Sequence, residues 1–164
     1  MSKRSASLCA LTVALLLAVA GNADDRRLAR NKAVARRVFT EILSQGKFEV
    51  AGEIYAQDFI VHGETRDGSL QEDQEAARGW KQAFPDGVMT VEQEVAEGDL
   101  VSVLWTGRGT NTGTGMGFPA TGKKVQVRGI TIWRITDGKI REEWGAFDRL
   151  SLMKQVGLLP AGTP

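Results

Sequence analysis

The chain has 164 residues, with 21 lysines and arginines against 20 aspartates and glutamates and a single histidine. This length suits one domain that buries its own core. The near-neutral charge gives no electrostatic case for nucleic acid or for anionic membranes, so neither partner is expected.

The first 23 residues have the organisation of a secretory signal peptide. Lys3 and Arg4 precede an apolar run over residues 8–20. The run is too short to span a bilayer comfortably, because a transmembrane helix needs about 20 apolar residues. We expect cleavage after Ala20 or Ala23, secretion or a periplasmic location, no membrane attachment after cleavage, and a mature domain over residues 24–164.

The only cysteine, Cys9, lies inside this segment. The mature domain would then have no thiol, no disulfide and no cysteine ligand for a metal. A single histidine adds too little for a metal cluster. The sequence therefore predicts no metal site.

Helical patterns come first in the mature chain. Apolar residues at helical spacing predict a long helix over residues 24–45, and a short second helix follows at 48–55. A strand is expected at 59–62, then a polar loop at 66–69. A third helix over 70–84 ends at the turn signal Pro85-Asp86-Gly87.

After Gly87 the pattern changes to the alternation of β-strands. Strands at 88–96 and 100–109 flank Gly98-Asp99, and strands at 123–136 and 139–147 flank Asp137-Gly138, a strong hairpin signal. Residues near 150–156 suggest a short closing helix. Because helices and strands segregate, the fold class is α+β, with a curved antiparallel sheet that curls into a cone.

Alternation along the last strands brings apolar residues to one face. This face has two interpretations: the wall of an apolar pocket, or ordinary sheet core beneath helices. Between the strands, Met116 and Phe118 either form a lid over the pocket or fasten the loop to the body. The shared faces are Val101, Val103 and Trp105; Val125, Val127, Thr131, Trp133 and Ile135; and, unless a bulge intervenes, Ile140, Glu142, Trp144, Ala146 and Asp148.

Two titratable residues are candidates for acid–base chemistry. Asp148 follows the last strand and is either a general base in an apolar cleft or the N-cap of the closing helix. His62 orients or polarises a substrate carbonyl, shares a proton with Asp148, or is a satisfied or exposed strand histidine. Glu142 is either a second pocket carboxylate or half of a surface ion pair with Arg134 or Arg141.

From Asn31 to Gly157 the chain resembles the SnoaL-like polyketide cyclase and ester cyclase group of the NTF2-like superfamily. The order and spacing of short motifs carry this resemblance over nearly the whole mature domain. These motifs are Asn31–Val34, Ala56–His62, Ala83–Asp86, Ala96–Val101, Trp105–Thr110, Met116–Lys123, Val127–Ile130 and Glu142–Asp148.

The resemblance implies a cone-shaped α+β barrel with a deep apolar pocket, often paired into a homodimer through its sheet. In the cyclases of this group, a pocket aspartate removes a proton from a carbon between carbonyls, and the carbanion closes a ring by intramolecular aldol addition without metal or cofactor. The position that matches this aspartate is Asp148, and His62 matches a pocket histidine. The position of Glu143 often carries histidine in similar sequences.

These observations lead to two main hypotheses. The first is an exported, cofactor-independent enzyme of cyclase, isomerase or hydrolase type that acts on a small apolar carbonyl compound. Asp148 and His62 would be its catalytic pair, and the substrate would contact the side chains named above. The second is a non-catalytic periplasmic module that binds a small molecule in the same pocket. A weaker third is a domain that only dimerises. The substrate-binding candidates are Trp105, Trp133, Trp144, Glu142, Met116 and Phe118.

Overall fold

The computed structural model describes residues 23–160. The expected signal peptide therefore lies outside the described residues, apart from Ala23. Within the described part, no helix is both long enough and apolar enough to pass through a membrane.

Helices occupy the first part of the chain, as the sequence predicts. An α-helix over residues 23–37 continues as the π-helix η1 (Val38–Ser44), and the Ser44 hydroxyl donates to the Phe39 carbonyl, five residues back. A short 3-10 helix, η2 (Phe48–Val50), leads into α2 (Ala51–Ile54). The long helix α3 (Leu70–Ala83) begins with a capping box, in which Ser69 and Glu72 satisfy each other's backbone N–H groups.

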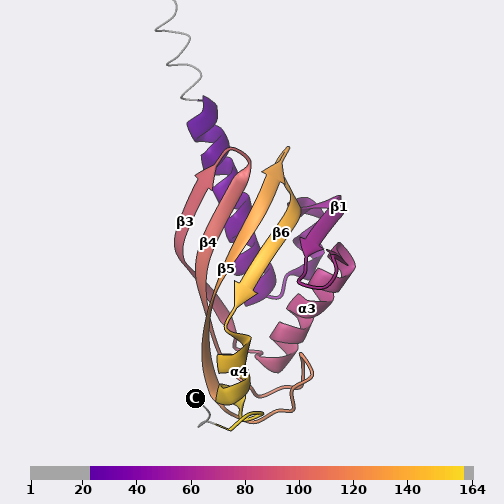
Figure 1. The fold of residues 1–164 in the computed structure, drawn as a ribbon, viewed down its shortest axis with the longest axis vertical. Helices are drawn as coiled ribbons and strands as arrows, with labels where there is room; N and C mark the ends of the chain where they lie inside the picture. Colours follow the sequence, from indigo (N-terminus) through magenta and orange to yellow (C-terminus); the bar gives the residue numbers. More distant parts are fainter. Residues whose placement is uncertain (1–22, 161–164) are drawn as a thin grey trace, which may run out of the picture.

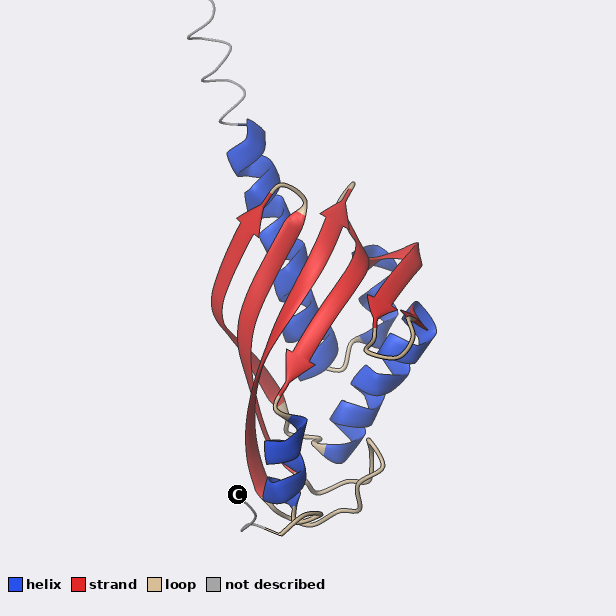
Figure 2. Cartoon of the chain, viewed as in Figure 1, coloured by secondary structure: helices blue, strands red, loops and turns tan. Residues whose placement is uncertain are grey.

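Six strands form one curved, unclosed sheet, which Figures 1 and 2 show with the long first helix passing behind it. The strand order is β2-β1-β6-β5-β4-β3. A short helix, α4 (Arg149–Val156), closes the chain and packs against β5. The strands are β1 (Tyr55–His62), β2 (Gly68–Ser69), β3 (Val88–Glu97), β4 (Leu100–Thr110), β5 (Lys124–Thr136) and β6 (Lys139–Phe147).

The predicted hairpins are present, and the sheet differs from the expectation in one pairing. Asp137 and Gly138 both have positive φ, as the tight turn between β5 and β6 requires. The four long strands β3 to β6 are antiparallel neighbours. However, β1 lies parallel to β6, so the sheet is mixed rather than wholly antiparallel.

The core lies between the inner face of the sheet and the helices. The predicted inward faces of β4 and β5 are confirmed, since Val101, Val103 and Trp133 are almost fully buried. Phe39 of η1 packs on Trp133, with ring centroids 5.3 Å apart. The α+β cone expected from the sequence is therefore the observed architecture.

Gly129 of β5 lies where the inner face has no room for a side chain. A Cβ there would lie 2.3 Å from Trp105 Cζ2 and 2.7 Å from the Ala146 carbonyl oxygen. We expect Gly129→Ala to destabilise the fold by about 2 kcal/mol or more through overpacking. Gly145→Ala is the matched control, because its nearest contact would be 3.5 Å away. Equal melting temperatures for the two variants would contradict this close approach.

Candidate active site

An apolar cavity of about 210 Å³ lies between η1, α3 and the inner face of the sheet. Most of its wall is aromatic or aliphatic, and its ionisable lining groups are two carboxyl groups and the hydroxyl of Tyr55. The lining residues are Val38, Phe39, Ile42, Leu43, Tyr55, Asp73, Ala76, Ala77, Trp80, Met89, Trp105, Met116, Val127, Thr131, Trp133, Glu143 and Phe147.

A bulge in β6 decides which of its side chains face this cavity. Arg134 pairs with Glu142 but Ile135 pairs with Ile140, so Arg141 is an extra residue in the ladder. An extra residue reverses the alternation of the side chains that follow it. Ile140 is buried, and beyond the bulge Glu143 and Phe147 line the cavity while Glu142 and Trp144 lie on the opposite, outer face. The bulge is the exception that the sequence prediction allowed: it separates Ile140 from Glu142, Trp144 and Ala146, which lie together on the outer face, and Asp148 follows the end of the strand.

Glu143 is a carboxylic acid placed in an apolar environment. Desolvation raises its pKa to about 8, and the nearby Asp73 carboxylate adds to the rise. The indole N–H of Trp133 opposes the rise by donating to Glu143 Oε2 over 2.7 Å. At neutral pH Glu143 therefore holds its proton and can donate it.

Asp73 projects from α3 toward the same cavity. Desolvation raises its pKa to about 6, whereas hydrogen bonds from Gln74 and Tyr55 lower it. Gln74 Nε2 donates to Asp73 Oδ2 over 3.1 Å. Burial raises the pKa of Tyr55, so its hydroxyl keeps its proton as a donor. Near pH 7 Asp73 is therefore mostly ionised, whereas Glu143 is mostly protonated.

Two of the three tryptophans predicted as pocket walls, Trp105 and Trp133, line the cavity, and their N–H groups already donate within the protein. Trp105 donates to Thr131 Oγ1 over 3.0 Å, and Trp133 donates to Glu143. A ligand therefore meets the ring surfaces of Trp105 and Trp133, and finds its polar partners in Asp73, Glu143 and Tyr55.

His62 lies in a second polar group on the outer face of the sheet, which we name the outer cluster: His62, Asp67, Arg134, Glu142 and Trp144. The ring nitrogens of His62 lie 2.9 Å from Glu142 Oε2 and 3.1 Å from Asp67 Oδ1. Its ring stacks on Trp144 at 4.5 Å, and Arg134 also binds Glu142. The hydrogen bond to Glu142 is the main cause that raises the pKa of His62.

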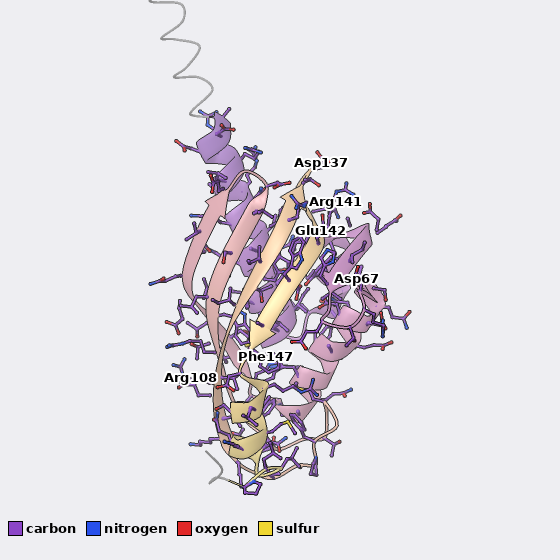
Figure 3. The ribbon with its side chains drawn as sticks, in the orientation of Figure 1. Asp67, Arg108, Asp137, Arg141, Glu142 and Phe147 are labelled. Atoms are coloured by element: carbon purple, nitrogen blue, oxygen red, sulfur yellow. The ribbon has the colours of Figure 1, made fainter. Side chains whose placement is uncertain are left out.

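The structure does not bring His62 and Asp148 together. Asp148 is exposed and caps α4, because its Oδ1 accepts the Ser151 N–H over 2.8 Å. This geometry matches the predicted alternative in which Asp148 is the N-cap of the closing helix. Figure 3 shows Phe147 at the end of β6, beside α4, and Glu142 farther along the same strand. Asp148 and His62 are both absent from the cavity lining.

The predicted substrate contacts divide into two groups. Trp105, Trp133 and Met116 line the cavity. Trp144 and Glu142 belong to the outer cluster, because the bulge at Arg141 places their side chains on the outer face of the sheet. Phe118 is 6% exposed and packs in the core, so it fastens its loop to the body and does not line the cavity.

Sequence reasoning missed both cavity acids. Asp73, Ala77 and Trp80 follow helical spacing and share one face of α3. An acid on a helix face of small and aromatic residues is the signal that could have identified Asp73. Its position in the first turn of the helix masked this signal, because acids are common there. Glu143 has no comparable local signal. Among residues 23–160, no group of three or more histidine, cysteine, aspartate or glutamate side chains is arranged to hold a metal ion.

The sequence profile described as SnoaL-like polyketide cyclase matches residues 33–156 of this chain. A search among curated proteins finds no match.

Solved structures with the same fold come from several bacteria. AclR from Streptomyces galilaeus, described as a candidate hydroxylase, is 25% identical with a TM-score of 0.75, over 83% of this chain and 86% of its own. IdmH from Streptomyces antibioticus, described as a candidate polyketide cyclase, is 26% identical with a TM-score of 0.68, over 77% and 98%. A candidate SnoaL-like polyketide cyclase from Jannaschia is 26% identical with a TM-score of 0.69, over 80% and 94%.

Proposed function

This chain belongs to the SnoaL-like polyketide cyclase family, and from that premise we propose that its aromatic cavity is the active site of an exported, cofactor-independent acid–base catalyst. Its substrate would be a small apolar carbonyl compound that undergoes intramolecular aldol cyclisation or a related proton transfer. One observation carries the proposal: Asp73 and Glu143 face one apolar cavity with pKa values of about 6 and about 8.

The two acids would have complementary roles. Ionised Asp73 takes a proton from a carbon next to a carbonyl, and the resulting enolate carbon attacks a second carbonyl of the same molecule. A carbon–carbon bond forms, and the oxygen of the second carbonyl takes the proton of Glu143. Transfer of the proton from Asp73 to Glu143 then restores both groups. The overall reaction is an isomerisation that requires only proton transfers, so no cofactor is part of the proposal.

The environment of the acids supports this division of roles. Apolar walls strengthen the hydrogen bond from Glu143 to the oxygen of the second carbonyl, because they limit competition from solvent. The Tyr55 hydroxyl stabilises the ionised form of Asp73. Charged amino and guanidinium groups are absent from the lining residues, so the site favours uncharged ligands over anions.

The first experiment uses 1-phenyl-1,3-butanedione as a probe and needs no knowledge of the natural substrate. Exchange of its central C–H for deuterium is followed by NMR in heavy water, with and without the protein. We expect catalysed exchange with a bell-shaped pH dependence, whose limbs lie near 6 and 8. Exchange at the buffer rate at every pH, with the probe bound, would refute the catalytic proposal.

That second outcome would favour the alternative, a non-catalytic module that binds a small molecule. The mostly apolar lining of the cavity supports this alternative as well. The two functions differ in what the acids do: a binding module keeps its affinity for the probe when Asp73 becomes asparagine, and has no exchange activity to lose.

We also propose that two copies of the chain pair through the outer face of the sheet. Ile130 and Ile132 on β5 are 48% and 36% exposed, and cross-strand pairing places Leu104, Ala146 and Trp144 beside them. A contiguous apolar face of this kind commonly marks an interface. We expect Ile132→Glu to convert a dimer to a monomer in sedimentation velocity, whereas Leu150→Glu on α4 leaves the mass unchanged. A wild-type monomer at high concentration would contradict the proposal.

A further inference from the structure

Met116 has a backbone conformation that its side chain does not favour. Its φ is 55°, and Gly117 follows with a φ of 78°. The Gly115 N–H donates to the Phe118 carbonyl over 3.3 Å, and the Phe118 N–H donates to the Gly115 carbonyl over 2.8 Å. Two positive φ values between such bonds define a turn in which glycine or asparagine is preferred. Methionine there costs on the order of 1 kcal/mol.

The loop that carries this turn is fixed to the body. Asn111 is fully buried: its amide donates to the carbonyls of Ala83 and Gly113, and its Oδ1 accepts from the N–H and hydroxyl of Thr121. A Cβ on Gly113 would lie 2.0 Å from the Gln82 carbonyl oxygen, so the loop backbone lies directly against the end of α3.

The tip of the loop meets α3 in the same close way. A Cβ on Gly115 would lie 2.2 Å from the Gly79 carbonyl oxygen, and a Cβ on Gly79 would lie 3.3 Å from the Met116 backbone nitrogen. These close approaches pack the tip of the loop directly against α3. The loop at Met116 is therefore part of the cavity wall.

The Met116 side chain lies where the cavity meets solvent. It lines the cavity and is partly exposed, as are Asp73 and Glu143. Ala76 of α3 and Phe147 of β6 are the two exposed residues of the cavity lining. We define these five residues as the mouth of the cavity. Among them, Met116 has the long, unbranched side chain that can fill a variable part of the opening.

We propose that Met116 sets the width of this mouth and so determines the largest ligand that the cavity admits. The strained turn is retained because it directs this side chain across the opening. The inference rests on the cavity as the binding site of the proposed function, but it concerns ligand size and not the proton transfers. A residue that only stabilised the loop would affect melting temperature without changing the preference among ligands.

The test compares Met116→Gly with Met116→Leu and Gly117→Ala. Glycine adopts the turn without strain and removes the side chain, so this variant is expected to fold. Leucine keeps the bulk, and Gly117→Ala disturbs the turn where an added Cβ meets nothing within 4 Å. Affinities for 1-phenyl- and 1-(2-naphthyl)-1,3-butanedione are measured by tryptophan fluorescence. We expect Met116→Gly to shift the preference toward the naphthyl probe by about 10-fold or more, and the two controls to keep the wild-type ratio.

A second measurement needs no ligand. Trp80, Trp105 and Trp133 all line the cavity, whereas Trp144 is on the outer face. In a Trp144→Phe background, quenching of fluorescence by acrylamide reports access through the mouth. We expect Met116→Gly to raise the quenching constant about twofold, and Met116→Leu to leave it unchanged. Equal quenching in the two variants would overturn the proposal. Altered quenching in a protein that catalyses no exchange would leave it standing and refute only the catalytic function.

Discussion

Asparagine in place of Asp73 is expected to slow the exchange of 1-phenyl-1,3-butanedione by about 100-fold or more, because it removes the general base. The amide still accepts hydrogen bonds from Gln74 and Tyr55, so its position in α3 is kept. Binding of the probe should change much less than exchange. The measurement is the initial rate of deuterium incorporation at pH 7, with the affinity determined in parallel.

Two further variants decide between the structural and the sequence-based assignments. Glu75→Gln alters an exposed acid on the same helix and is expected to keep the wild-type rate. Asp148→Asn removes the carboxylate that the family resemblance selects. If Asp148→Asn lost the activity and Asp73→Asn retained it, the base would be Asp148, and the cavity acids would have no part in proton transfer.

The sequence predicted the order of the elements well because most of the signals are local. The Pro85-Asp86-Gly87 turn and the Asp137-Gly138 hairpin each depend on a few neighbouring residues. The inward faces of β4 and β5 follow from unbroken alternation, and burial of Val103 and Trp133 confirms them. Such signals need no knowledge of distant contacts.

The candidate site was harder to predict because it depends on a register that the local sequence does not encode. From Ile140 to Trp144, simple alternation places Ile140, Glu142 and Trp144 on one face, which is chemically reasonable. The bulge at Arg141 follows from pairing with β5 and β1 together, where both ladders shift register. Arg141 is held there by Thr136 and Asp58, and Asp58 lies 83 residues earlier in the sequence. A single extra residue therefore exchanges Glu142 for Glu143 in the cavity.

Burial of Glu143 serves the proposed proton transfer, but it should destabilise the folded protein once Glu143 ionises at high pH. This loss of stability is the second large effect that we expect. The unfolded chain ionises this glutamate above its ordinary pKa of 4.5, whereas the folded chain ionises it only above about 8. Between these values the native state binds more protons than the unfolded state, so wild-type stability falls as pH rises. Asp73 adds a fall in the same direction between its ordinary pKa of 3.8 and about 6.

Glutamine in place of Glu143 removes its part of this dependence. We expect Glu143→Gln to be more stable than wild type at pH 9 by on the order of 2 kcal/mol, after allowance for partial solvent exposure. The gain should be smallest well below the ordinary pKa of 4.5, where Glu143 is protonated in both the folded and the unfolded state of the wild type. In thermal unfolding the gap at pH 9 corresponds to roughly 5 °C or more.

The difference in unfolding free energy between wild type and Glu143→Gln isolates the titration of Glu143 from that of the other groups. His62 has a raised pKa, so its stabilising contribution is lost as pH rises, but it is present in both proteins and cancels in the comparison. Glu92→Gln, at an exposed position of β3, should give a constant offset from wild type at every pH. Parallel curves for Glu143→Gln and wild type would mean that the cavity imposes no cost on an ionised Glu143. In that case it could not serve as the proton donor at neutral pH, and Tyr55 would be the remaining donor in the cavity lining for the oxygen of the second carbonyl.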